Sequence, residues 1–197
     1  MKTLLGISVL LFLVGQNFAQ NSVAQIDTYV KSIKKVTESK RSPKIVVADT
    51  AAFDEDKSRW KKFASEKALE KYRDKSETYS IAYSWKSGGR LVATNFTDFS
   101  PSGDWTRYTF HYFRPDGTTA KVEAELRTFY GDFIVIRDYY YDTAGKLLAK
   151  RSRYLDLNTN KPKKPTPEVA DENSSFFKTT HYKRTNKLPF ASIVGIK

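Results

Sequence analysis

The chain has 197 residues, no cysteine, two histidines and a formal net charge of +12. The absence of cysteine excludes disulfide bonds and a lipoprotein attachment site, so burial of an apolar core must hold the fold together. A zinc site needs three or four clustered ligands, and two isolated histidines do not predict one. No other metal and no cofactor is predicted.

The first 19 residues (1–19) predict a cleaved secretory signal peptide. Lys2 precedes an apolar run from Leu4 to Val14, and Ala19 offers a small residue at the expected cleavage site. A retained membrane anchor is the weaker alternative, because a bilayer core needs about 20 apolar residues. We therefore expect a secreted or periplasmic protein.

The basic charge has two interpretations for an exported protein. Anionic glycans, lipid headgroups and envelope proteins are the expected partners outside a cell, and nucleic acid is not expected. The positive residues are spread along the chain, so a solvated basic surface that only aids solubility is equally compatible with the composition.

Two helical segments are predicted after the signal peptide. Residues 21–40 carry Val and Ile at three- and four-residue steps, the period of a helix with one apolar side. Residues 54–77 predict a second helix, with carboxylates at 54–56 near its N-terminal end and a break near Ser65. Between the two, Ile45 to Val47 are compatible with a short strand or an extended linker.

Residues 77–157 change to an apolar period of two, which predicts β-strands with one buried side. Three stretches of this region repeat at a spacing of 28 residues, each with an aromatic residue four positions before a glycine. The pairs are Trp85 and Gly89, Phe113 and Gly117, and Tyr141 and Gly145. Glycine reaches positive φ without steric cost, so the three glycines are predicted to form the turns of three hairpins.

The third hairpin resembles one unit of the YD repeats found in bacterial surface and toxin shells. In those repeats a Tyr-Asp pair precedes a Gly-Lys/Arg-Leu turn. The matching residues here are Tyr141, Asp142, Gly145, Lys146 and Leu147. The other two hairpins lack the Asp after the aromatic residue, so the resemblance does not imply a YD shell.

The predicted fold class is α+β, with one or two N-terminal helices packed on a six-stranded antiparallel β-meander. A sheet that curls into a half-barrel is compatible with the same pattern. Residues 20–157 are expected to form a single domain, and residues 158–173, rich in Pro, Lys and Asn, a linker. The tail, 174–197, is expected to dock on the domain, and its last apolar segment is a candidate edge strand.

No catalytic residue is predicted. His111 alternates with aromatic neighbours and is expected at the surface or at a sheet edge, and His181 lies in the basic tail. The chain has neither the serine elbow of acyl hydrolases nor a phosphate-binding glycine loop. Glu123 and Glu125 share one strand face, but their basic neighbours favour an ordinary charged surface.

The predicted sheet concentrates tyrosine and arginine, a combination that suits an acidic or sugar-like ligand. The alternative is that the aromatic rings fill the layer between the helices and the sheet. The candidate ligand-binding residues are Trp85, Arg90, Arg107, Tyr108, Tyr112, Arg137, Tyr139, Tyr141 and Arg151.

The preferred functional hypothesis is an exported, non-enzymatic binding module for an anionic or amphipathic envelope component or a protein partner. The alternatives are a lipid or lipoprotein carrier with an apolar cavity, and a carboxylate-dependent hydrolase. A large apolar interior would favour the carrier. Two facing carboxylates in a cleft would favour the hydrolase, and a solid core with a basic aromatic patch would favour the binding module.

Overall fold

The computed structural model describes residues 22–39, 43–174 and 176–196, and the predicted signal peptide lies outside them. The elements, in chain order, are α1 (Val23–Ser39), β1 (Ile45–Asp49), β2 (Trp60–Phe63), α2 (Glu66–Arg73), β3 (Ser80–Ser87), β4 (Arg90–Phe99), β5 (Trp105–Phe113), β6 (Thr119–Thr128), β7 (Phe133–Tyr141), β8 (Leu147–Asp156), α3 (Pro167–Ala170), and two short 3-10 turns, η1 (Thr185–Lys187) and η2 (Ser192–Val194). None of the described helices is both long and apolar enough to cross a membrane.

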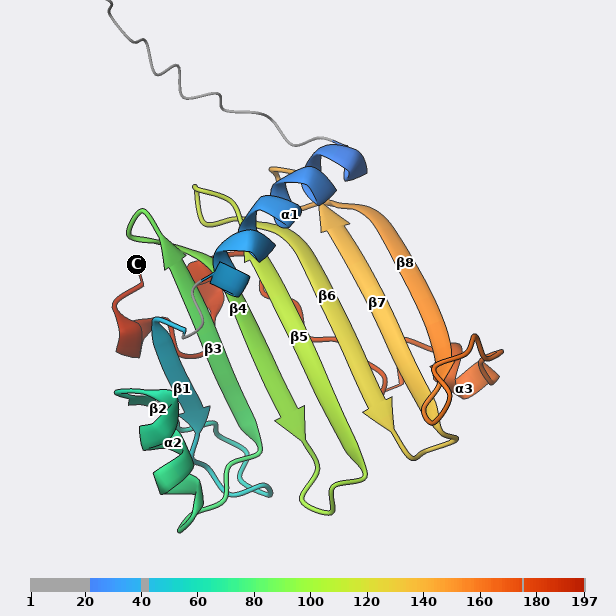
Figure 1. Ribbon diagram of the computed structural model, residues 1–197, viewed down its shortest axis with the longest axis horizontal. Coiled ribbons are helices and arrows are strands. Elements are labelled where there is room, and N and C mark those ends of the chain that lie inside the picture. The colour runs from blue at the N-terminus through green and yellow to red at the C-terminus, as the bar shows by residue number, and fades with distance from the viewer. Residues whose placement is uncertain (1–21, 40–42, 175, 197) are drawn as a thin grey trace, which may run out of the picture.

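The strands form one open antiparallel sheet in the order β2-β1-β3-β4-β5-β6-β7-β8 (Figure 1). The α+β class is as predicted, and β3 to β8 follow one another as consecutive hairpins. The predicted count of six strands is too low, because β1 and β2 add two strands beside β3.

The three repeated glycines lie in the β3–β4, β5–β6 and β7–β8 turns, with φ values of 77°, 80° and 79°. Because the strands alternate in direction, all three turns lie at one end of the sheet, the end that α1 crosses (Figure 1). The strand register shifts beside each of these turns. Such bulges re-aim the side chains that follow them.

The predicted second helix is wrong over its first half. Residues 54–59 form a loop, in which Glu55 pairs with Arg59, and Trp60–Phe63 is the edge strand β2. Only Glu66–Arg73 is helical, and Ser65 caps it by accepting from the N–H of Ala68. A three-residue step puts Trp60 and Phe63 on one side of a helix but on opposite sides of a strand, and the structure buries them in different clusters.

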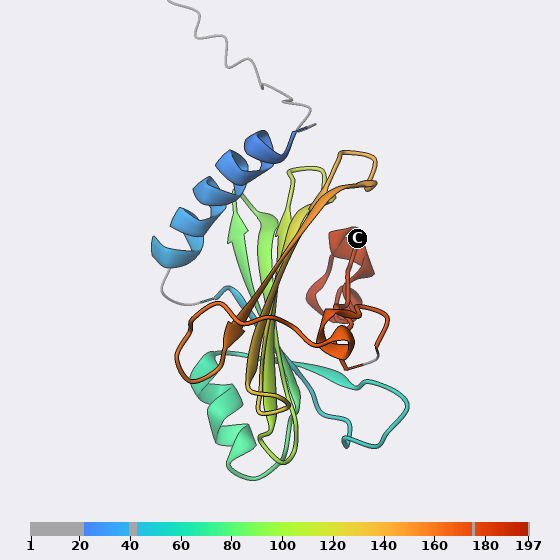
Figure 2. The same ribbon diagram turned by 90° about the vertical axis from the view of Figure 1, so that its right-hand side faces the viewer.

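The sheet carries different layers on its two sides (Figure 2). We call the side that packs against α1 and α2 the helix face, and the side covered by residues 167–174 and 176–196 the tail face. Ile26, Val30 and Ile33 of α1 are buried on the helix face, and Leu69 of α2 is buried beside β1 and β3. Ser22 and the side chain of Gln25 form a reciprocal cap that begins α1.

The tail covers the second face as a layer of turns. Val169 of α3 and Phe177 pack on Leu126 and Val135, so the segment predicted as a linker contributes to the core. Leu188, Phe190 and Ala191 pack with residues of β1, β3, β4 and β5 in another cluster. The described C-terminal residues form 3-10 turns over the sheet and do not add the expected edge strand.

Candidate functional site

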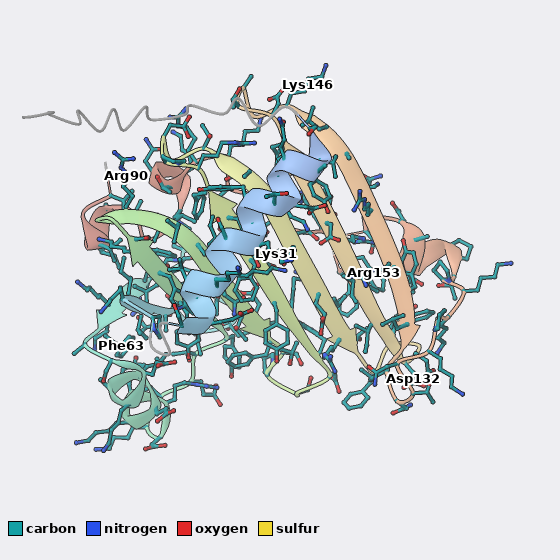
Figure 3. The ribbon with its side chains drawn as sticks, turned by 45° about the horizontal axis from the view of Figure 1, so that its top comes forward. Lys31, Phe63, Arg90, Asp132, Lys146 and Arg153 are labelled. Carbon is teal, nitrogen blue, oxygen red and sulfur yellow. The ribbon has the colours of Figure 1, made fainter. Side chains whose placement is uncertain are left out.

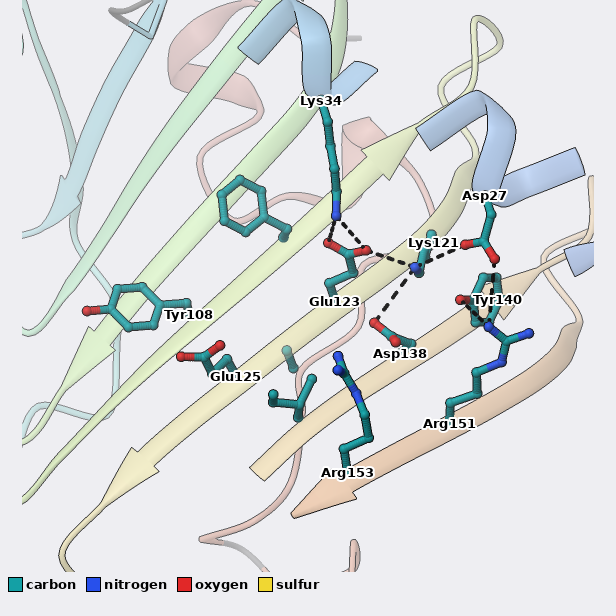
Figure 4. Close-up of a pocket in the computed structure, with 13 residues that line it drawn as sticks. Asp27, Lys34, Tyr108, Lys121, Glu123, Glu125, Asp138, Tyr140, Arg151 and Arg153 are labelled. Atoms are coloured by element: carbon teal, nitrogen blue, oxygen red, sulfur yellow. Dashed lines mark hydrogen bonds and ion pairs between the residues drawn. The ribbon is translucent and has the colours of Figure 1, made fainter. Parts of the chain in front are cut away.

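An open groove of about 740 Å³ lies between α1 and the helix face of β5 to β8 (Figure 4). Its walls hold four carboxylates and four cationic side chains: Asp27, Glu123, Glu125, Asp138, Lys34, Lys121, Arg151 and Arg153. Three aromatic residues, Tyr108, Phe110 and Tyr140, also line it. The formal charges of these walls therefore cancel.

The alternation of the strands brings these residues together. Lys121, Glu123 and Glu125 occupy every second position of β6, so they point to one side. The register then places Glu123 opposite Asp138 on β7, and Asp138 opposite Arg151 on β8. A row of acidic and basic groups consequently crosses three neighbouring strands.

Lys121 is the centre of the ionic network. Its side chain is 7% exposed, and its Nζ lies 2.8 Å from Glu123, 3.2 Å from Asp27 and 3.8 Å from Asp138. The same ammonium group lies over the ring of Tyr140, 4.6 Å from the centroid. Burial opposes the charge, but the bonds to Glu123 and Tyr140 and the nearby carboxylates outweigh it and raise the pKa of Lys121.

Glu123 ties α1 to the sheet. Its carboxylate lies 2.8 Å from Nζ of Lys34 on α1 and accepts a hydrogen bond of 2.9 Å from the hydroxyl of Tyr112, in addition to its ion pair with Lys121. Burial alone would raise its pKa, but the two lysines overcome this and hold the pKa of Glu123 below its ordinary value. Asp27 provides a second connection, because Arg151 lies 3.7 Å from it. The helix is thus held in place by charge as well as by its apolar side.

Asp138 differs from the carboxylate directly opposite it. Burial raises its pKa, the charge of Lys121 opposes this, and Glu123 adds to the rise. The pKa of Glu123 is lowered and that of Asp138 is raised, although both contact the same ammonium group. Two neighbouring carboxyl groups whose pKa values diverge can take different protonation roles.

The part of the groove away from α1 is open to solvent. Tyr108 is 36% exposed, and Arg151 and Arg153 are exposed along β8. Glu125 is partly exposed and accepts from Arg127 at 2.7 Å. These side chains offer aromatic, anionic and cationic contacts over a short length of sheet.

The sheet divides the sequence-predicted residues between its two faces. Trp85, Tyr108, Tyr112 and Arg151 lie on the helix face, and only Tyr108 and Arg151 line the groove. Arg107, Arg137, Tyr139 and Tyr141 lie on the tail face. Arg90 is exposed at the β3–β4 turn, several strands away from Arg153 on β8 (Figure 3).

The tail-face arginines hold the tail in place. Arg137 is 2% exposed and donates to the backbone carbonyl groups of Phe177 and Val169. Arg107 donates to the carbonyl of Phe176. Both guanidinium groups therefore bind the chain itself.

The tail-face tyrosines have a comparable role. The hydroxyl of Tyr141 is hydrogen-bonded to Nδ1 of His181. The ring of Tyr139 meets the same imidazole edge-on, with centroids 4.1 Å apart.

The predicted surface position of His111 is wrong, because its side chain is fully buried beneath the tail.

Sequence reasoning missed Asp27, Lys34, Lys121 and Asp138 as site residues. The alternation of β6 did show that Lys121 and Glu123 share a face, but they were interpreted as an exposed charged surface. No signal in the sequence indicates where α1 crosses the sheet, and that crossing decides which charges become enclosed.

Within the described ranges, no group of three or more His, Asp or Glu side chains is placed to hold a metal ion. Comparisons with known proteins find no matching family model, no matching curated protein and no matching solved structure. The functional conclusion therefore depends on the geometry of the groove alone.

Proposed function

We propose that the protein is an exported, non-enzymatic binding module whose groove beneath α1 holds an envelope molecule of mixed charge. The preferred ligand is a glycan that carries both acidic and basic groups. One observation supports this choice above the others: an open groove lined by four carboxylates, four cations and three aromatic rings.

Charge balance decides between ligand classes. A polyanion would meet as many carboxylates as cations on these walls, so it would gain little net attraction. A chain of mixed charge and many hydroxyl groups finds donors and acceptors at every position. The exposed ring of Tyr108 offers an apolar face on which a sugar ring can lie, whereas the ring of Tyr140 is buried and covered by Lys121 and Arg151.

The lipid-carrier alternative has less support. The apolar residues on both faces are packed into closed clusters with their neighbours, as with Ile26 and Tyr140 on one face and Phe113 and Phe190 on the other. The groove itself is charged and open. A lipid tail would leave these charges without water or partners, which is unfavourable.

A carboxylate-dependent hydrolase is the second candidate, because Glu123 and Asp138 form an opposed pair with diverging pKa values in the same groove. In that role Asp138 would donate a proton and Glu123 would remain ionised. Lys121 contacts both groups, and this favours a structural network over a catalytic pair.

The binding proposal is tested with the processed chain, residues 20–197, on an array of neutral, anionic and mixed-charge oligosaccharides, followed by calorimetry. We expect mixed-charge glycans to bind best. Tyr108→Ala and Arg153→Ala should each weaken binding about tenfold, equivalent to about 1.4 kcal/mol. Phe129→Ala and Lys146→Ala are matched controls, since both side chains are exposed outside the groove.

Three outcomes contradict the proposal. Equal loss of affinity in the control variants would place the ligand elsewhere. Preference for polyanions, with affinity that collapses at high salt, would indicate general attraction by the basic surface. Release of reducing ends, abolished by Asp138→Asn with binding retained, would instead support the hydrolase.

A further inference from the structure

A second cavity, of about 220 Å³, lies on the tail face and is distinct from the groove. Arg107, Thr109 and His111 of β5 line it, and they alternate with Tyr108 and Phe110, which line the groove on the other side. The roof comes from the tail and the far wall from β2 and β4. At about 30 Å³ for each water, the space would hold roughly seven waters or one small organic molecule.

His111 presents an unsatisfied N–H to this region. Its Nε2 accepts from the backbone N–H of Tyr182 at 3.2 Å, and its Nδ1 has no hydrogen-bond partner. Burial, aided by the charge of His181, outweighs the nearby backbone groups of Thr109 and Thr180 and lowers the pKa of His111 to about 3, so the ring is neutral. A neutral ring that accepts through Nε2 carries its proton on Nδ1.

Trp60 presents a second unsatisfied donor. Its indole Nε1 is buried without a hydrogen-bond partner, and the residue lines the same cavity. Indole nitrogen can only donate. Buried donors are nearly always paired in folded proteins, so two unpaired N–H groups on one cavity indicate an absent acceptor.

Asp98 and Arg107 add one charge of each sign. They are directly opposite each other on β4 and β5, and both line the cavity. Neither group is fully used: Arg107 donates to the carbonyl of Phe176, and Asp98 accepts from the hydroxyl of Ser80. The carboxylate of Asp49, also on the wall, already accepts from two backbone N–H groups.

We propose that this cavity binds a small zwitterion with adjacent carboxylate and ammonium groups, the chemistry of a free α-amino acid. The ligand carboxylate accepts from Trp60, His111 and Arg107. The ligand ammonium group donates to Asp98. A simple anion fits less well, because the two aspartates outnumber the single arginine on these walls.

The cavity can be reached from solvent and has room for an apolar side chain. Ser58 and Thr180 on its wall are exposed. The rings of Phe96 and Tyr182 form its apolar side. A small ligand can therefore enter between the loop before β2 and the tail.

The test adds each of the twenty free amino acids in turn to the processed full chain. Binding is measured by the change in melting temperature, by Trp fluorescence and by backbone amide chemical shifts. We expect at least one to bind saturably with a dissociation constant of about 1 mM or below. The shifted amides should belong to the cavity walls. The corresponding amine and the corresponding carboxylic acid should each bind at least about tenfold more weakly, since each lacks one of the two charges.

Variants locate the ligand. Trp60→Phe and Asp98→Asn should each weaken binding about tenfold, the effect expected for loss of one hydrogen-bonding partner. Trp85→Phe is the matched control, because the Nε1 of Trp85 is also buried without a partner but lies on the helix face away from this cavity.

Three results would overturn the inference: no amino acid changes the spectra at millimolar concentration, the deaminated acid binds as tightly as the amino acid, or the Trp85 variant loses as much affinity as the Trp60 variant. The first result would mean that water alone fills the cavity. The amide-shift map needs no variant, so the inference stays testable even if a substitution prevents folding. Failure here would leave the glycan proposal intact, because the two sites share no residue.

Discussion

The two faces of the sheet treat buried charge in different ways. On the helix face, Lys121 is surrounded by carboxylate side chains, and part of that network remains open to solvent. On the tail face, Arg137 donates to two backbone carbonyl groups, has a single carboxylate, Glu172, 3.4 Å from its Nε, and is sealed from water. The first arrangement leaves side chains free to exchange partners with a ligand, whereas the second makes the tail a fixed layer of the fold.

The largest expected effect concerns Arg137. Arg137→Met should lower the free energy of unfolding by about 3 kcal/mol or more, because two buried carbonyl oxygens lose their donor at about 1–3 kcal/mol each. Arg151→Met on the adjacent strand is the control, since Arg151 is 58% exposed and should change stability by at most about 1 kcal/mol. Urea denaturation of both variants measures the difference. Similar losses would mean that the two faces do not differ in this way.

The pH dependence of stability should come mainly from the tail face. His111 takes a proton near pH 3 when folded and near pH 6.5 when unfolded, so the unfolded chain gains the proton first on acidification. Stability should therefore fall by about 2 kcal/mol between pH 8 and pH 5, a range in which ordinary carboxyl groups remain ionised. His111→Phe should remove most of this slope, and the remainder belongs to His181, whose pKa is also lowered by burial. An unchanged slope in that variant would assign the titration to another group.

Several parts of the fold follow from local patterns. Alternation in β6 and the turn glycines predicted the hairpins from β3 to β8, because strand period and turn chemistry depend on near neighbours. The strand at Trp60 was missed, since a three-residue apolar step fits a short helix as well.

The candidate site was harder to predict. Of the candidate ligand-binding residues, Tyr108 and Arg151 line the groove, whereas Arg107 and Arg137 point to the opposite face. Faces on different strands can be matched only when register and bulges are known, and each repeated hairpin contains a register shift. The residues that cover each face come from α1 and the tail, far away in the chain.

Two turn glycines of similar φ give a smaller, matched test. Gly117 and Gly145 have φ values of 80° and 79°, so replacement by Ala should cost each about 1–2 kcal/mol. An added Cβ at Gly117 would also lie 2.8 Å from Oγ1 of Thr185 in the tail, whereas that at Gly145 meets nothing within 4 Å. We expect Gly117→Ala to lower the free energy of unfolding by about 1 kcal/mol more than Gly145→Ala does, in line with the cost of overpacking. Thermal denaturation measures this, and equal losses would mean that the tail yields at this point.

The smallest expected effect is the pairing of Lys34 with Glu123 on the helix face. The lysine side chain is 42% exposed, so a double-mutant cycle with Lys34→Met and Glu123→Gln should give a coupling of about 0.5–1 kcal/mol. The coupling should shrink in 1 M salt. A coupling of 3 kcal/mol or more would show that this face is sealed as tightly as the other.

The cluster that joins Ile45 and Val47 to Leu188 and Phe190 unites segments that are about 140 residues apart in the chain. A polypeptide synthesised from its N-terminus cannot complete that cluster until Leu188 and Phe190 have been made. Contacts of such long sequence separation slow folding, and until they form, one apolar side of the sheet is open to aggregation. A chain that lacked Leu188 and Phe190 would keep that side of the sheet exposed.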